Sequence, residues 1–268
     1  MSDPATDFLK HIIDKTDYGD DLFTNRESGI TILTGAGISA ESGIQTFRGS
    51  DGLWCGHHIE DVATPQGFAV DPDLVHNFYN ERRRALLSTD IKPNAAHEAL
   101  ARLEREWPGR VTIVTQNIDN LHERAGSENV FHMHGELLRG LCALCQKTAD
   151  VRADMSAQDA CPSCGAKGHM RPDIVWFGEM PYRMEEIEEH LLSSAIFLSI
   201  GTSGHVYPAA GFVTTANQIG AYSIELNLEP SRNAGLFTEG YYGPAGQVVP
   251  EFVEKLLGHA RAETKGSA

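Results

Sequence analysis

The sequence contains no apolar stretch that approaches the roughly 18 residues needed for a membrane-spanning helix. Its first residues include Asp3, Asp7 and Asp14, and they lack the basic segment followed by an apolar segment that marks a secretory signal. Both absences predict a soluble, cytoplasmic protein that has no membrane partner.

Basic residues are scarce, because 22 lysines and arginines stand against 37 aspartates and glutamates, which gives a formal net charge of -15. This charge repels nucleic-acid phosphates at long range and favours basic partners, such as a protein segment that bears a lysine. Solubility alone explains an acidic surplus equally well. We therefore expect no nucleic-acid partner, while the charge does not identify a partner by itself.

Cysteine is also scarce, with five residues, and an odd number without an export signal argues against a disulfide framework. Four of the five form two Cys-x₂-Cys pairs, Cys142 with Cys145 and Cys161 with Cys164. Their spacing is typical of a tetrahedral Cys₄ zinc site, which is structural because it leaves no coordination position for water. Cys55 is interpreted as an ordinary thiol.

Short apolar, β-branched segments predict four buried parallel strands, at Gly29–Thr34, Val111–Thr115, Ala195–Ile200 and Tyr222–Asn227. Stretches with helical periodicity lie between the strands, at Leu74–Leu87, Asn94–Trp107, Met184–Leu192 and, behind Pro208, Ala209–Ile219. This alternation predicts an α/β fold with a Rossmann-like parallel sheet.

Two regions interrupt the alternation, residues 40–90 and residues 135–172, and the second contains the paired cysteines. We assign both to a smaller inserted domain that carries a cofactor loop, a helical module and a zinc module. Residues 29–39, 91–134 and 173–268 then form the Rossmann-like domain. Residues 1–28 are interpreted as an N-terminal extension without an identifiable chemical role.

The first predicted strand is followed by Gly35-Ala36-Gly37-Ile38-Ser39-Ala40. Glycines in such a turn let backbone N–H groups approach a pyrophosphate, and a helix that starts there adds a favourable dipole. A dehydrogenase would continue with a second strand that ends in an acidic residue about 20 positions later. The sequence instead continues with a glycine-rich loop at 45–54, so a nucleotide would be held differently; an ordinary tight turn would use the same glycines.

Three further predicted strands end in small or polar residues. Thr115 leads into Gln116-Asn117-Ile118-Asp119, Ile200 into Gly201-Thr202-Ser203, and Leu226 into Asn227-Leu228-Glu229. In open α/β sheets, ligands bind beyond the carboxyl ends of the strands, and together these segments describe one cleft for a dinucleotide. Each segment alone is also compatible with a turn or a helix cap.

Two histidines lie in His132-Met133-His134-Gly135, after the strand-like Val130-Phe131. A histidine at a strand end has a pKa suited to a general base, although a lone histidine is more often structural. Because His132 and His134 alternate, they project from the same face of a strand. The pattern does not say which of them acts.

In their order along the chain, these motifs resemble the sirtuin family from about Gly29 to Leu257. The resemblance rests on Gly35–Ser39, Thr46–Arg48, Gln116–Asp119, His134-Gly135, the four paired cysteines, Gly201–Ser203 and Asn227–Glu229. It is closest to the bacterial CobB-type deacylases, which share Asp51–Trp54 and Val175–Glu179. The resemblance implies an NAD-dependent protein-lysine deacylase with one structural zinc ion.

The resemblance also implies roles for individual residues. His134 matches the general base of the family, and Asn117 is the second residue implied to be catalytic. Asn117 and Asp119 match residues that hold the nicotinamide-ribose end of NAD, with Gln116 near the ribose, and Ala245 matches a position near the adenine. An extended substrate would lie between Val175, Phe177 and Gly178 on one side and Gly204 and Val206 on the other, where it would add a strand by backbone pairing. The residues implied for NAD are Gly35, Ala36, Gly37, Ser39, Phe47, Arg48, Trp54, Gln116, Asn117, Ile118, Asp119, Gly201, Thr202, Ser203, Asn227, Leu228, Glu229 and Ala245.

The implied reaction consumes NAD. The acyl-lysine oxygen attacks the ribose carbon that bears nicotinamide, and the products are free lysine, nicotinamide and an O-acyl-ADP-ribose. An ADP-ribosyltransferase with the same fold remains an alternative. So do an NAD-dependent oxidoreductase, which the glycine motif alone permits, and a zinc module without enzymatic activity.

The acyl preference depends on Tyr79, Arg82 and Ala63. Tyr79 and Arg82 are three positions apart in the predicted helix 74–87, so they project from one face, where an arginine fork and a phenol suit a carboxylate. By spacing alone, Arg82-Arg83-Arg84 is also compatible with a solvated basic face. The Tyr-x-x-Arg pattern and the small Ala63 resemble the desuccinylase class of sirtuins, which implies removal of succinyl as well as acetyl groups.

Overall fold

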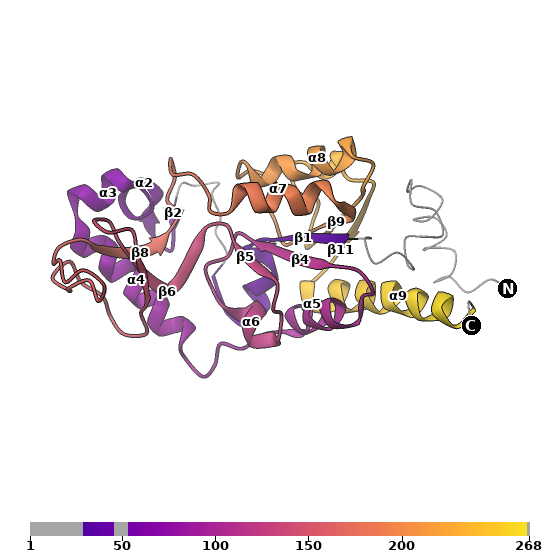
Figure 1. Ribbon diagram of the computed structural model, residues 1–268, viewed down its shortest axis with the longest axis horizontal. Helices are drawn as coiled ribbons and strands as arrows, with labels where there is room; N and C mark the ends of the chain where they lie inside the picture. The colour runs from indigo at the N-terminus through magenta and orange to yellow at the C-terminus, as the bar shows by residue number, and fades with distance from the viewer. Residues whose placement is uncertain (1–28, 46–52, 267–268) are drawn as a thin grey trace.

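The computed structural model describes residues 29–45 and 53–266, and its centre is a six-stranded parallel sheet in the order β11-β10-β9-β1-β4-β5 (Figure 1). The strands are β1 (Gly29–Thr34), β4 (Val111–Thr115), β5 (Val130–His132), β9 (Ser194–Ile200), β10 (Tyr222–Asn227) and β11 (Glu239–Tyr242). Every neighbouring pair in this sheet is parallel. The predicted Rossmann-like α/β fold is confirmed.

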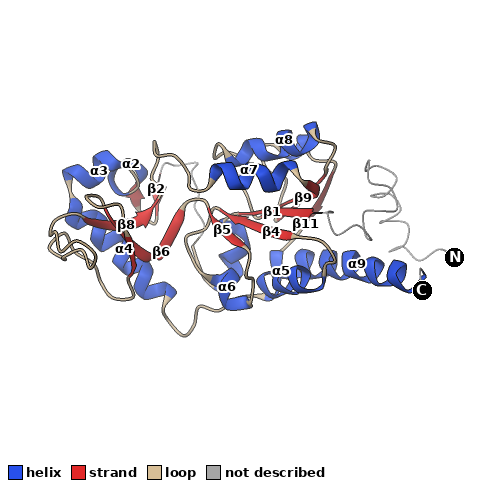
Figure 2. Ribbon diagram, viewed as in Figure 1, coloured by secondary structure: helices blue, strands red, loops and turns tan. Residues whose placement is uncertain are grey.

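Helices cover both faces of the sheet (Figure 2). One face carries α5 (Ala95–Glu106), α6 (Leu121–Ala125) and α9 (Ala245–Gly266), and the other carries α7 (Met184–Leu192) and α8 (Phe212–Gln218). β1, β4 and β9 are buried along their whole length, which explains why they are mostly apolar or β-branched instead of alternating between apolar and polar residues. None of the helices in the described part of the chain combines the length and apolar character needed to cross a membrane.

The predicted elements agree with the observed ones except at two segments. The helix expected at Ala209–Ile219 is a 3-10 turn, η3 (Ala209–Gly211), followed by α8. Gly211 lies at this junction, where the low helix propensity of glycine favours a break. The segment after β1 is likewise a 3-10 helix, η2 (Ala36–Ser42), instead of an α-helix.

Most of the remaining elements gather at the left of Figure 1, apart from the parallel sheet. They are the hairpin β2 (Leu53–Trp54) and β3 (His57–His58), helices α2 (Ile59–Val62), α3 (Pro65–Val70) and α4 (Pro72–Leu86), and the antiparallel sheet of β7 (Thr148–Asp150), β6 (Gly135–Cys142) and β8 (Met170–Ile174). The short η4 (Ala234–Leu236) precedes β11. The boundaries proposed for a smaller domain stay a prediction.

The topology brings several strand ends to one place. β1 pairs with β4 on one side and with β9 on the other, and Thr34 is in register with both Thr115 and Ile200. The chain therefore continues from β1 to β4 on one side of β1 and later returns as β9 on the other side. This reversal of strand order opens a crevice beyond the carboxyl ends of a parallel sheet. The segments that begin at Gly35, Gln116 and Gly201 lie at this crevice.

Candidate functional site

Three glycines let the loops after β1 and β9 touch. A Cβ on Gly37 would lie 2.7 Å from the Cα of Gly201, and a Cβ on Gly201, which has φ +63, would overlap the backbone of Ile38. The N–H of Gly35 donates to the carbonyl of Ile200 (3.0 Å) and that of Gly37 to the carbonyl of Gly201 (2.9 Å). Two of the amides expected to face a pyrophosphate are therefore already bonded within the chain, and these glycines serve backbone contact.

Asn117, Ser39 and Asp119 form a buried polar network that joins the ends of β1 and β4. Nδ2 of Asn117 donates to the carbonyl of Gly35 (3.1 Å) and to Oγ of Ser39 (3.2 Å). Oγ of Ser39 donates in turn to Oδ2 of Asp119 (3.0 Å), while Oδ1 of Asp119 accepts from the backbone N–H of Leu121 (3.0 Å). Burial raises the pKa of the Asp119 carboxyl, although these hydrogen bonds oppose the rise.

His134 is arranged as a neutral base. Its Nδ1 lies 3.2 Å from the backbone carbonyl of Gln116, which only accepts, so Nδ1 carries the proton and Nε2 keeps its lone pair. No hydrogen bond within the described ranges occupies Nε2. Burial lowers the pKa of His134 below its ordinary value, so the ring is neutral at pH 7.

His132 is arranged as a cation. Its Nδ1 lies 3.2 Å from the carbonyl of Asn117 and its Nε2 lies 2.6 Å from Oε1 of Glu123, so both nitrogens face acceptors, and only the doubly protonated ring donates to both. Burial lowers the pKa of His132, but the hydrogen bond to Glu123 and its charge outweigh burial, and the net pKa is raised. The sequence could not separate the two histidines, whereas their hydrogen bonds give them opposite protonation states.

The segment 175–178 is attached to His134 and Ala63 through its backbone. Val175 N–H donates to the carbonyl of His134 (2.9 Å) and Phe177 N–H to the carbonyl of Ala63 (2.9 Å). Trp176 N–H donates to the Glu179 carboxylate (2.8 Å). The N–H groups of three successive residues, 175–177, are thus already bonded within the protein. A substrate strand that adds here would therefore pair with the carbonyls of this segment and with the N–H of Gly178, which has no acceptor among the described residues.

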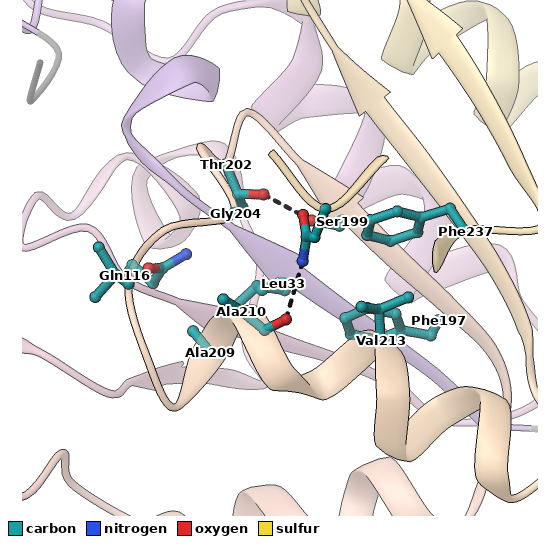
Figure 3. A pocket seen from close by; sticks show the side chains of 12 residues that line it. Leu33, Gln116, Phe197, Ser199, Thr202, Gly204, Ala209, Ala210, Val213 and Phe237 are labelled. Atoms are coloured by element: carbon teal, nitrogen blue, oxygen red, sulfur yellow. Dashed lines mark hydrogen bonds between the residues drawn. The ribbon is translucent and has the colours of Figure 1, made fainter. Parts of the chain in front are cut away.

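Four of the predicted site residues, Gln116, Thr202, Gly204 and Val206, line one small cavity (Figure 3). Within it the hydroxyls of Ser199 and Thr202 are 2.8 Å apart. The remaining lining residues are mostly apolar: Leu33, Phe197, Ala209, Ala210, Val213, Asn233 and Phe237. The ends of β4 and β9 therefore share this cavity, which has room for only about one water molecule.

The other residues predicted for NAD are more scattered. Asn227 donates through Nδ2 to the carbonyl of Thr202 (2.7 Å), so the end of β10 joins the loop after β9. Leu228, Glu229 and Ser203 are exposed, and the partly buried Ala245 begins α9. Trp54 and Ile118 instead pack with the cluster that contains Ala63 and Tyr79. Phe47 and Arg48 lie outside the described residues.

Tyr79 and Arg82 lie in an aromatic pocket on α4. Tyr79 is fully buried, and its hydroxyl oxygen accepts from Nε1 of Trp176 (3.0 Å), which leaves the phenol proton available for another acceptor. Burial raises the pKa of Tyr79, so the phenol stays protonated. The guanidinium of Arg82 lies 3.2 Å above the ring of Phe78 and 5.6 Å from that of Trp54. The sequence did not indicate that Phe78 and Trp176 belong to this acyl pocket, because neither is part of the Tyr-x-x-Arg pattern.

The three consecutive arginines have three different surroundings. Arg84 is exposed and pairs with Asp154 at 2.6 Å. Arg83 is buried, and its Nε donates to the carbonyl of Leu137 (3.0 Å). Arg82 donates to the carbonyl of Phe78, and its buried Nε has no hydrogen-bond partner in the described part of the chain. The three arginines therefore do not form one solvated face, because Arg83 is buried and Arg82 is partly buried over Phe78.

The four paired cysteines fit a zinc ion. Their sulfur atoms all lie within 4.8 Å of one another, and all four are free thiols. Sγ of Cys142 is 3.9 Å from Sγ of Cys164, and Sγ of Cys145 is 3.7 Å from Sγ of Cys161. A tetrahedron with Zn–S bonds of about 2.3 Å has S···S edges of about 3.8 Å. The cluster matches this geometry, so the four cysteines can hold one structural zinc ion.

Removal of a zinc-binding cysteine is expected to destabilise the small antiparallel sheet and α4 with it. The side chain of Asn80 on α4 bonds both the carbonyl and the N–H of Met155, which packs with the cysteines. Because the binding energy of a structural metal is folding energy, Cys142→Ser and Cys161→Ser should lose zinc and melt at lower temperature. Metal analysis and thermal unfolding test this, with the exposed Cys55→Ser as the control that keeps about one zinc per chain. Absence of zinc from the wild type, or fully stable cysteine variants, would contradict the assignment.

Comparisons with known proteins agree with this geometry. The model of the Sir2 family matches residues 35–208. An NAD-dependent protein deacylase of Vibrio vulnificus is 57% identical over 89% of this chain and 97% of its own length. A solved complex of a Sir2 homolog with NAD has a TM-score of 0.77 and 35% identity, and covers 96% of this chain and 94% of that one. A structure described as "Sir2-p53 peptide-NAD+" has a TM-score of 0.72 and 28% identity, and covers 98% and 100%. The chain belongs to the Sir2 family.

Proposed function

We propose that this protein is an NAD-dependent protein-lysine deacylase that removes succinyl as well as acetyl groups. The observation that carries the proposal is the arrangement of His134 and Asn117 around the Gln116 backbone. His134 offers an unprotonated Nε2, and the Asn117 amide is fixed by two acceptors from the loop after β1. Deacylation of this kind needs a base that accepts a proton from a ribose hydroxyl, and the unprotonated Nε2 of His134 is suited to accept it.

The crevice suits the nicotinamide half of NAD. Asn117 and Asp119 are buried beyond the carboxyl end of β4, where polar side chains fixed by the network with Gly35 and Ser39 would orient a ligand. NAD is consumed in the reaction and supplies the electrophilic ribose carbon. The protein's own task is to hold that carbon near the acyl-lysine oxygen and to keep His134 unprotonated. Thr202, Ser203, Asn227 and Ala245 are proposed to contact the adenosine half.

The substrate is proposed to be an acyl-lysine in an extended protein segment. Val175 to Gly178 would bind one side of that segment, with Gly204 and Val206 on the other. The Val175–His134 hydrogen bond supports this placement, because a peptide beside Val175 lies close to the base. Tyr79, Arg82 and the small Ala63 would line the acyl end.

Mass spectrometry of matched unmodified, acetyl-lysine and succinyl-lysine peptides, incubated with and without NAD, tests the function. Deacylation that requires NAD and releases nicotinamide and an O-acyl-ADP-ribose is expected. A peptide or protein that gains ADP-ribose would favour a transferase instead. Growth of the reduced-nicotinamide absorbance would identify an oxidoreductase, since deacylation transfers no hydride.

A further inference from the structure

We propose that Glu123 is a positioning residue of this site, which acts through its ion pair with His132 to hold the Gln116–Asn117 backbone in place for catalysis. The inference rests on the proposed deacylase function and assigns a residue outside the motifs that define it. Glu123 lies on α6, where its carboxylate is 40% exposed, and the side chain of His132 is only 9% exposed. The imidazole ring of His132 thus links the partly exposed carboxylate of Glu123 to the buried backbone at Asn117.

The two histidine rings bond consecutive carbonyls. His134 donates to Gln116 and His132 donates to Asn117, both at 3.2 Å. The side chain of Asn117, between them, is fixed by Gly35 and Ser39. The tautomer of His134 and the direction of the Asn117 amide therefore depend on the same short backbone segment. A shift of this segment would misplace both groups together.

His132 makes both of its bonds only as a cation. A neutral imidazole carries one N–H, so it donates either to Glu123 or to Asn117 but not to both. Burial favours the neutral ring, and the 2.6 Å contact with the Glu123 carboxylate is the main interaction that opposes burial. Loss of the Glu123 charge would thus weaken the hydrogen bond from His132 to the Asn117 carbonyl, although Glu123 does not itself contact that carbonyl.

The other ionisable groups near His132 come from three elements. Glu136 on β6 also favours the cation, and His122 on α6 is fully buried with its pKa lowered well below the ordinary value, so it is neutral. Asp119, in the loop after β4, feels the His132 charge as a lowering of its own pKa, against the larger effect of burial. The cation at His132 thus also favours the ionised form of Asp119.

Glu123→Gln tests the proposal, because glutamine keeps the size and an acceptor oxygen but removes the charge. The matched control is Glu128→Gln, a neighbouring exposed carboxylate that does not contact His132. We expect kcat of Glu123→Gln at about pH 8 to fall roughly tenfold, the scale of a small misplacement of reacting groups, with little change in melting temperature. The rate should recover partly as the pH is lowered, because acid restores the second proton of His132 without help from Glu123. The alkaline decline should therefore begin at lower pH than in the wild type or in Glu128→Gln.

Two further measurements separate positioning from general destabilisation. In the wild type, NMR of ¹⁵N-labelled histidine should find both His132 nitrogens protonated at neutral pH, and in Glu123→Gln only one. In a His132→Gln background, Glu123→Gln should cause little additional loss of kcat. An unchanged pH profile in Glu123→Gln, a neutral His132 in the wild type, or fully additive losses in the double variant would overturn the proposal. A wild type that is inactive on every acyl peptide would refute the deacylase function instead, and the NMR arm would still decide the state of the ion pair.

Discussion

His134→Ala is expected to lower kcat for deacylation by at least about 100-fold, the usual scale for removal of a general base, while NAD binding survives. The ring contributes an unprotonated Nε2 near the reacting ribose, and alanine contributes none. His134 contacts the rest of the protein mainly through Nδ1 and its backbone, so its loss should spare the Gly35 and Asn227 segments. Single-turnover kinetics and isothermal titration with NAD measure the two effects separately.

His134→Asn is the matched control for geometry. Its amide is able to donate to the Gln116 carbonyl, as Nδ1 does, but it is not a base. We expect it to be as inactive as His134→Ala, because the proton acceptor is missing in both. Near-normal deacylation by either variant would show that His134 is not the general base. A loss in His132→Ala as large as that in His134→Ala would favour His132 as the base instead.

The pH dependence of the wild-type deacylation rate is a further test of His134 as the general base. Burial lowers the pKa of His134, so its protonation occurs below the ordinary histidine value of about 6.5. The rate should therefore stay high down to that value and fall only under more acidic conditions, as the base becomes protonated. The acid limb should disappear from the residual rate of His134→Asn.

The sequence predicted those parts of the fold that depend on local burial and spacing. β1, β4 and β10 have the predicted bounds because each is a short apolar segment that ends at a polar or glycine residue and is buried. The zinc cysteines were predictable for a different reason. Two Cys-x₂-Cys pairs supply all four zinc ligands, and their spacing alone is typical of a zinc site whose pairs the fold brings together.

The sequence could not predict contacts between residues that are distant along the chain. Tyr79 and Trp176 are 97 positions apart, and only the packing of α4 against the segment after β8 joins them. The protonation states of His132 and His134 were equally hidden, because they depend on carbonyls and a carboxylate that the fold places beside each ring. Likewise, the glycines after β1 suggest free amides, whereas two of those amides bond the end of β9.

The second large effect is expected for Arg82→Met. Methionine keeps much of the length and apolar contact of arginine over Phe78 but removes the guanidinium. We expect kcat/KM for desuccinylation to fall by an amount equivalent to about 2–4 kcal/mol of transition-state stabilisation, the scale for a charged hydrogen-bonded partner in a closed site. The kcat/KM for deacetylation should fall much less. Steady-state kinetics on peptides that differ only in the acyl group measure the difference.

The surroundings of Arg82 give the physical reason. Its charge is held over an aromatic ring, its Nε is buried without a partner among the described residues, and no carboxylate in the described part of the chain forms an ion pair with it. A buried donor without an acceptor costs about 1–3 kcal/mol, so an acidic acyl group that bonds the guanidinium would relieve this cost. An acetyl group has no carboxylate and gains nothing from it. Tyr79, one helical turn earlier, has its phenol proton available to the same acceptor.

Arg84→Met provides a control with the same chemical change on the same helix. Arg84 is exposed and pairs with Asp154 at the surface, where such ion pairs contribute little, so both activities should be nearly unchanged. Ala63→Phe should also narrow the acyl pocket and reduce desuccinylation, because Ala63 is buried in the cluster that contains Tyr79. Equal losses on acetyl and succinyl peptides in Arg82→Met would mean that the arginine serves the fold, because only a contact with the acyl carboxylate distinguishes the two substrates.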